Sequence, residues 1–233
     1  MIPLRDSIRS QTTPYINIGI IVTCVFVFIL QLTSTADRML LSWAFVPAHI
    51  ISPSAWAEYG LQHIALTAFS SIFMHGDIPH IAMNMLFLWV FGDNIEDRIG
   101  HLKYLVFYLL CGLAATLAHS VVTLFGAVPM VGASGAIAGV MGAYFVLFKQ
   151  SSIRTFVLIW FIPTIVELPA ILFIGIWFAF QLLSGLGTLG MGAGIAFWAH
   201  IGGAVAGYYL VRSFTRRKPR PPEPRVINLR IIE

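Results

Sequence analysis

Six apolar segments constrain this chain more than any other feature of its sequence. Each is about long enough to cross a hydrocarbon layer about 30 Å thick as a helix, and only 10% of all residues are charged. The segments that we expect to span a membrane are residues 15–32, 79–96, 102–123, 134–148, 166–184 and 196–212. The sequence therefore predicts an all-α polytopic membrane protein that forms one bundle of six transmembrane helices.

The positively charged residues indicate how the bundle is oriented. With six spans, every Lys and Arg except Arg38 falls on the same side of the membrane as both chain ends, and Lys and Arg in short loops stay cytoplasmic. We expect a short cytoplasmic N-terminus at residues 1–14, a membrane domain at 15–213 and a basic, proline-rich cytoplasmic tail at 214–233. The net charge of +4 then reflects topology and not a nucleic-acid partner. The N-terminal sequence resembles neither an organelle leader nor a cleaved signal peptide, which favours the plasma (inner) membrane of a prokaryote.

Two connecting stretches depart from simple linkers. Residues 33–73 contain many aromatic residues and few charges, which is typical of a folded loop that lies in the outer membrane interface. Residues 153–161 are apolar but too short to cross, and Pro163 and Glu167 follow them. We expect a cytoplasmic or re-entrant loop there.

Two polar groups lie deep inside the apolar segments. Ser134 begins the run that ends at Lys149, and His200 precedes Arg212 by a similar number of residues. At about 1.5 Å of rise per residue, both groups lie roughly 18 to 22 Å above the basic ends of their segments. Polar groups at this depth are candidates for function because burying them is costly. Taken singly, however, each fits a structural hydrogen bond better than a catalytic role.

The residues around Ser134 favour a nucleophile at the start of a helix. Gly132 and Gly135 flank this serine and permit a tight turn with close backbone approach. A helix N-terminus offers free amide groups and a positive dipole end, which suit an oxyanion on a carbonyl attacked by the serine. The motif is weak by itself because small residues are common in membrane helices.

His200 lies one turn before Gly203, and Gly203 and Gly207 together form a small-residue face that allows close helix packing. If the neighbouring helix carries Ser134, the imidazole can accept the hydroxyl proton and later return it to a leaving amine. We expect no Asp or Glu at this depth to orient the ring. The sequence therefore predicts a Ser-His dyad without an acid.

His80 and Asn84 share one face of the second apolar segment, four residues apart. Asn84 lies about 18 Å above Glu96. This height places Asn84 level with Ser134 and His200. Two side-chain donors at this depth can complete an oxyanion hole together with the backbone amide of Ser134. The alternative is a hydrogen-bonded pair between helices that has no catalytic role.

The combination of these motifs resembles the rhomboid intramembrane serine proteases, and the resemblance covers residues 43–207. The similarity lies in the order and spacing of several short motifs, which are Gly132-Ala133-Ser134-Gly135, Ala199-His200 with Gly203 and Gly207, His80 with Asn84, and Gly92 with Glu96 and Gly100. Together these motifs are specific to the family, although the serine motif alone is not.

The resemblance implies a six-helix rhomboid-like bundle with a water-filled cavity open to the outer side and a fifth span that moves as a lateral gate. It implies that Ser134 is the nucleophile, that His200 is the general base, and that His80, Asn84 and the Ser134 amide stabilise the oxyanion. Its substrates would be single-pass membrane proteins, cut near the outer membrane face after a small residue. The partners are then these substrates and the lipid bilayer, with no cofactor and no metal.

Two positions depart from the family pattern. Family members usually carry a Trp-Arg pair before the second span, where this chain has Leu61-Gln62-His63-Ile64-Ala65-Leu66. Some members pack a tyrosine on the catalytic imidazole, and that position is Ala138 here. Either Trp198 or an aromatic residue of the fifth span replaces this contact, or no residue does.

The remaining polar and aromatic residues have open interpretations. Glu96 is expected to be structural, as a cap of the inner end of its helix near Arg98 and Lys103. The aromatic residues of the fifth span either line the gate or have a lipid-facing or packing role; they are Phe173, Trp177 and Phe180.

Other functional classes fit the sequence less well. A metalloprotease would need a motif such as His-Glu-x-x-His, and an aspartyl protease would need paired intramembrane aspartates; the sequence contains neither. The serious rival is a non-catalytic rhomboid-like protein that binds transmembrane helices as a chaperone or trafficking factor. A small transporter is a third possibility, although the spans show no repeated halves.

Overall fold

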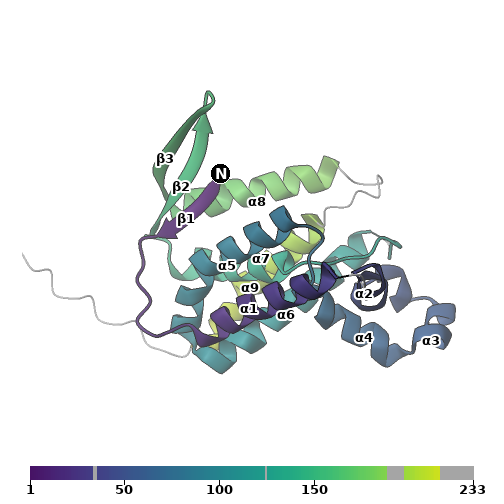
Figure 1. Ribbon diagram of the computed structural model, residues 1–233. Helices are drawn as coiled ribbons and strands as arrows, with labels where there is room; N and C mark the ends of the chain where they lie inside the picture. The colour runs from purple at the N-terminus through teal and green to yellow at the C-terminus, as the bar shows by residue number, and fades with distance from the viewer. Residues whose placement is uncertain (34–35, 124, 188–196, 216–233) are drawn as a thin grey trace, which may run out of the picture.

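The six predicted segments form helices of one bundle in the computed structural model, which describes residues 1–33, 36–123, 125–187 and 197–215 (Figure 1). The bundle helices are α1 (Tyr15–Gln31), α5 (Ile78–Ile99), α6 (His101–Val122), α7 (Ser134–Leu147), α8 (Ala170–Gly187) and α9 (Phe197–Phe214). Each of them covers most of one predicted segment. Residues 216–233 of the predicted tail lie outside the described part of the chain.

Two of the described helices, α6 and α8, are long and apolar enough to cross a membrane on length and composition alone. The helices α1 and α7 are apolar but shorter, and α5 carries polar residues along its length and charged residues in its last turns. The structure therefore establishes a mostly helical fold, and six spans stay a prediction.

The predicted first loop is built from short helices. They are α2 (Ala36–Trp43), the 3-10 helix η1 (Pro47–Ile50), α3 (Pro53–Tyr59), α4 (Leu61–Ser70) and the 3-10 helix η2 (Ser71–Phe73). The hydroxyl of Ser70 donates to the carbonyl oxygen of Trp43 at 2.8 Å, which ties α4 to the end of α2. The indole N–H of Trp56 donates to the carbonyl oxygen of His49 at 3.1 Å. The segment is therefore folded, as the sequence predicted.

A three-stranded antiparallel sheet corrects the all-α prediction. Its strands are β1 (Ile2–Asp6), β2 (Ser152–Ile159) and β3 (Ile162–Pro169), in the order β1-β2-β3. The expected loop at 153–161 is thus nearly all of the first strand and the turn of a β-hairpin, and the expected terminal segment 1–14 begins with a strand that pairs with β2. The cause is the composition of the hairpin, in which β-branched and aromatic residues favour extended backbone.

Asp6, at the end of β1, ties the sheet to the bundle. Its carboxylate accepts a hydrogen bond from the hydroxyl of Tyr144 in α7 at 2.6 Å and another from the amide of Asn94 in α5 at 2.8 Å. Burial is the main cause that raises the pKa of this carboxyl from 3.8 to about 6. The N-terminal residues are therefore part of the fold and contact the end of α7 that lies opposite Ser134.

Glu96 has different partners from those predicted. Its fully buried carboxylate accepts backbone hydrogen bonds from Ile16 at 3.0 Å and Asn17 at 2.7 Å, and it also contacts the imidazole of His101. The residue before α1 supplies no side-chain cap for this helix. The carboxylate of Glu96 takes that place and stabilises the N-terminal turn of α1. Glu96 thus caps α1, and the predicted arrangement with Arg98 and Lys103 was wrong.

The helices α7 and α9 run parallel, with their backbones in direct contact. A β-carbon placed on Gly203 would lie 2.0 Å from the carbonyl oxygen of Gly135, and one placed on Gly207 would lie 1.9 Å from that of Gly139. No side chain fits at such distances, so both positions require glycine. The predicted Gly203 and Gly207 face therefore meets α7, the helix that begins with Ser134.

Candidate active site

The packing of α7 against α9 brings Ser134 and His200 together. Ser134 is the first residue of α7, and His200 lies in the first turn of α9. The Nε2 atom of the imidazole lies 2.8 Å from the Oγ atom of the serine, which is hydrogen-bonding distance. The depth estimate from the sequence predicted this contact, and both side chains lie at the same end of their parallel helices.

Gln181 of α8 makes the second hydrogen bond of the imidazole. Its Oε1 atom lies 2.7 Å from Nδ1 of His200, and its side chain is buried. Because an amide oxygen only accepts, this contact places the ring proton on Nδ1 and leaves the lone pair of Nε2 free to accept the serine proton. Gln181 was not predicted, because only an acid was considered as a second partner of the ring at this depth. A lone amide side chain inside the apolar run 166–184 was the signal that could have revealed it.

Trp177, one turn before Gln181 on α8, supplies the aromatic contact to the imidazole. Its ring centroid lies 5.6 Å from that of His200. Ala138, at the position where some family members carry tyrosine, is fully buried in α7. The aromatic contact to His200 therefore comes from the fifth span, as one of the alternatives predicted. Of the other two expected gate residues, Phe173 is buried in the core whereas Phe180 is exposed.

Gly132 holds the loop before Ser134 close to His80 of α5. Its φ of 131° lies in a region that favours glycine. A β-carbon at this position would lie 2.9 Å from Nε2 of His80 and 3.6 Å from Oγ of Ser134. The imidazole of His80 therefore approaches the serine across the space that the missing side chain leaves.

Asn84 lies one turn further along the same face of α5. Its side chain is buried, and its Nδ2 atom makes no hydrogen bond in the described structure. A buried amide donor without a partner is costly, and such a group fits a site that an oxygen atom of a ligand occupies. Ser134 adds a third donor, because the first amides of a helix have no partner within the helix.

His75 is a buried histidine that was not among the predicted site residues. Its ring packs edge-on against that of His80 at a centroid distance of 5.2 Å, and both of its ring nitrogens lack partners in the described structure. Its backbone amide donates to Oε1 of Gln31 at 3.1 Å. Within the described ranges, no group of three or more His, Cys, Asp or Glu side chains is placed to hold a metal ion.

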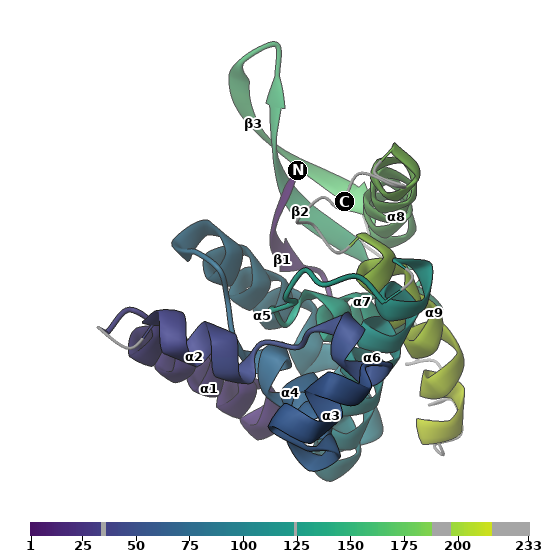
Figure 2. The ribbon, with the colours of Figure 1, turned by 90° about the vertical axis from the view of Figure 1, so that its right-hand side faces the viewer.

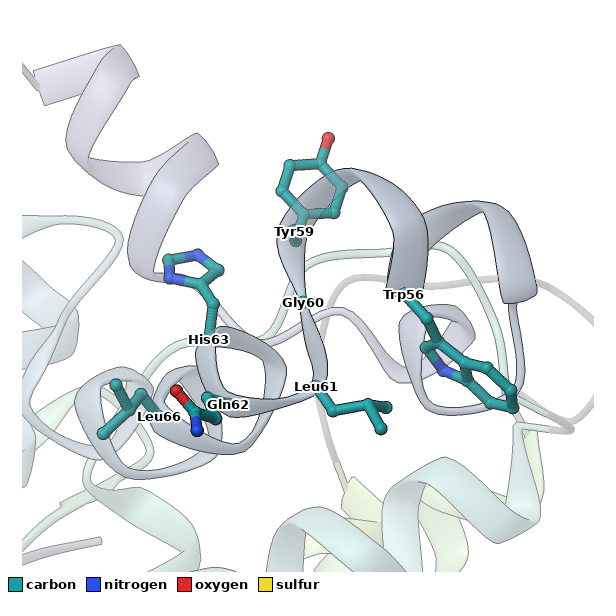
Figure 3. A pocket seen from close by; sticks show the side chains of 7 residues that line it. All are labelled: Trp56, Tyr59, Gly60, Leu61, Gln62, His63 and Leu66. Carbon is teal, nitrogen blue, oxygen red and sulfur yellow. The ribbon is translucent and has the colours of Figure 1, made fainter.

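A separate pocket of about 610 Å³ lies in the first-loop region (Figure 3). It is lined by residues of α3, α4 and the turn between them, which are Trp56, Tyr59, Gly60, Leu61, Gln62, His63 and Leu66. None of these residues belongs to the helices that carry Ser134, Gln181 and His200. The pocket is therefore distinct from the candidate active site.

Comparison with known proteins defines the class. Residues 62–217 match the Rhomboid domain, so the chain belongs to the rhomboid family and is an integral membrane protein. It is 26% identical to the rhomboid protease GlpG of Yersinia pestis (strain Pestoides F) over 218 residues, which cover 92% of this chain and 68% of that relative. It is 28% identical to the rhomboid protease GluP of Bacillus subtilis (strain 168) over 201 residues, which cover 86% of this chain and 34% of that relative.

Replacement of Gln181 tests its effect on the ring of His200. In Gln181→Leu, the Nδ1 proton loses its acceptor, and a net hydrogen-bond contribution of about 1 kcal/mol predicts a shift of the tautomer ratio by about 3- to 10-fold. The change is measured by 15N NMR of labelled histidine, with the His200 signal assigned from the His200→Ala spectrum. Gln181→Glu keeps an acceptor and serves as the control. An unchanged His200 spectrum in Gln181→Leu would show that Gln181 does not select the tautomer.

Proposed function

We propose that this protein is an intramembrane serine endopeptidase that cleaves transmembrane segments of single-pass membrane proteins. The observation that carries the proposal is the 2.8 Å contact between Oγ of Ser134 and Nε2 of His200 at the start of α7, where helix amides face the reacting group. Membership in the rhomboid family and the similarity to two rhomboid proteases support it.

In the proposed reaction, His200 acts first as base and then as acid. Its Nε2 atom takes the proton of Ser134 as Oγ forms a bond to the substrate carbonyl carbon. The tetrahedral intermediate collapses when His200 gives this proton to the leaving amine and the C–N bond breaks. A water molecule then attacks the acyl-enzyme, His200 takes the proton of that water, and the same proton returns to Oγ as the ester bond breaks. Gln181 keeps the ring oriented through these steps.

The oxyanion of each tetrahedral intermediate would be stabilised by His80, Asn84 and the backbone amide of Ser134. The support for this role is the unpartnered Nδ2 atom of Asn84 and the approach of His80 to Gly132. Donors that are fixed before the reaction stabilise the developing charge without reorganisation.

The placement of the dyad favours cleavage near the outer end of a substrate span. We propose both termini on the cytoplasmic side, with α7 and α9 starting in the outer half of a prokaryotic inner membrane. The helix α8 would act as the lateral gate, since Trp177 and Gln181 both contact His200 from it. A small residue and helix-breaking residues in the substrate favour cleavage because a helical backbone shields its carbonyl groups from attack.

Substitution of either dyad residue tests the chemistry. Ser134→Ala removes the nucleophile and His200→Ala removes the base, so each should reduce cleavage of a transmembrane reporter to background. Triads lose about 10⁴-fold or more in kcat on comparable changes. The measurement is reporter cleavage by purified protein, with thermal stability as a control for folding. Cleavage at the wild-type rate by either folded variant would refute the assignment. Retained binding of the reporter by wild-type protein without any cleavage would favour the non-catalytic binder.

Asn84 is tested by truncation of its side chain. Loss of one oxyanion donor costs about 10² to 10³ in kcat, so Asn84→Ala should be slow but not inactive, with little change in KM. Met83→Ala, at the neighbouring exposed position on α5, is the matched control and should cleave at the wild-type rate. An Asn84→Ala rate within experimental error of this control would remove Asn84 from the oxyanion hole.

A further inference from the structure

The β2–β3 hairpin has an apolar end that projects away from the helix bundle (Figures 1 and 2). It is closed by a two-residue turn in which Trp160 is 90% exposed and Phe161 is 92% exposed. No charged residue occurs from Thr155 to Val166. The neighbouring exposed residues are also apolar; they are Leu158, Ile159, Ile162 and Ile165. Exposed apolar patches of this kind mark interaction sites.

The turn itself does not account for the aromatic residues. Trp160 has a φ of 50° and Phe161 a φ of 68°, and positive values at both central positions are those of a type I′ turn. Such turns favour Asn-Gly because bulky side chains are strained there. This sequence therefore has two large aromatic residues at the positions where the backbone tolerates them least, and a contact outside the described chain explains them better than turn formation does.

The position of the hairpin indicates what this contact is. The residues from Ser152 to Pro169 lie between α7 and α8 in the sequence, and the apolar helix α8 begins at the next residue, Ala170. In both views the hairpin runs crosswise to α8 and beyond it (Figures 1 and 2). When α8 spans the membrane, the hairpin tip therefore lies beside the bundle at the depth of the membrane surface, and not above the bundle in water.

The charges at the base of the hairpin fit the same surface. Arg154 on β2 pairs in register with Arg5 on β1 and with Glu167 on β3, and all three side chains are exposed. Lys149, in the turn that precedes β2, is also exposed. Basic groups beside an apolar aromatic tip suit anionic lipid headgroups, and tryptophan is enriched at this interface.

The free edge of the sheet argues against a second copy of the chain as the partner. β3 is the edge strand on the side opposite β1, and it contains Pro163 and Pro169. Pro163 lies opposite Leu158, and Pro169 lies opposite Ser152. In a hairpin with a two-residue turn, these are pairs without hydrogen bonds between the strands, so the backbone nitrogen of β3 faces away from β2 at both positions. Proline at these two positions removes two of the outward-facing donors that strand addition along β3 would use.

We infer that the β2–β3 hairpin is a lateral membrane anchor, whose Trp160-Phe161 tip inserts into the interfacial region of an anionic leaflet at the start of α8. The inference depends on the membership of the chain in a membrane protein family and not on proteolytic activity. It assigns this hairpin a binding partner, namely the lipid surface beside the gate helix.

The test places a fluorescent reporter near the tip of the full chain in vesicles of phosphatidylcholine and phosphatidylglycerol. Leu158→Cys is labelled with an NBD group, since the native Cys24 and Cys111 are fully buried. Lipid carrying a nitroxide near the headgroup should quench this label, whereas aqueous iodide should not. Gln11→Cys is the water-exposed control and Leu183→Cys on α8 the lipid-exposed control.

The matched variant combines Trp160→Asn with Phe161→Gly. Asn-Gly is the preferred type I′ turn, so the hairpin stays folded while the aromatic anchor is lost, and lipid quenching of the label at residue 158 should fall about twofold or more. Iodide quenching and weak lipid quenching of the label in the unmodified tip would overturn the inference. Equal lipid quenching of the label in the unmodified hairpin and in the double variant would also overturn the inference. Quenching of one label by a label on a second copy, without lipid quenching, would identify a contact between copies instead.

Discussion

The direct contact between the backbones of α7 and α9 is the constraint on which the site depends. Gly203 and Gly207 lie against the carbonyl oxygens of Gly135 and Gly139, where any β-carbon would overlap them. Between apolar helices in lipid there is little hydrophobic force, so close packing of small residues must supply the association. Because these contacts begin one turn after His200, they also determine how far the imidazole lies from the hydroxyl of Ser134.

The candidate site joins three helices around one imidazole ring. Nε2 of His200 faces Ser134 on α7, and Nδ1 faces Gln181 on α8. Trp177 covers the ring from the same helix, and Asn84 on α5 has a side-chain nitrogen without a hydrogen-bond partner in the described structure. A histidine whose two nitrogens are both bonded has a defined tautomer and orientation, which a dyad without an acid otherwise lacks. Since α8 holds one of these bonds, movement of the proposed gate would change the dyad as well as admit substrate.

The sequence predicted the parts of the fold and site that depend on depth and helix periodicity. Apolar length located the bundle helices, and helix rise alone placed Ser134 level with His200. The prediction from sequence failed where two interacting residues are far apart in the chain. The carboxylate of Glu96 caps α1, and the hairpin pairs with β1 from the other end of the chain. The hairpin was also missed because its turn lacks Gly and Asn, the usual signals of a type I′ turn. Gln181 was missed because only acids were considered as partners of the ring.

The most direct measurement of the central claim is the rate at which a fluorophosphonate probe labels Ser134 in Gly207→Ala. The added β-carbon would lie 1.9 Å from the carbonyl oxygen of Gly139, so α9 must shift away from α7, whereas a β-carbon at the exposed Gly175 of α8 meets nothing within 4 Å. A displacement of about 1 Å can cost about 10² in rate. The account predicts labelling slower by about this factor in folded Gly207→Ala and wild-type labelling in Gly175→Ala. Equal labelling of Ser134 in the two folded variants would contradict it.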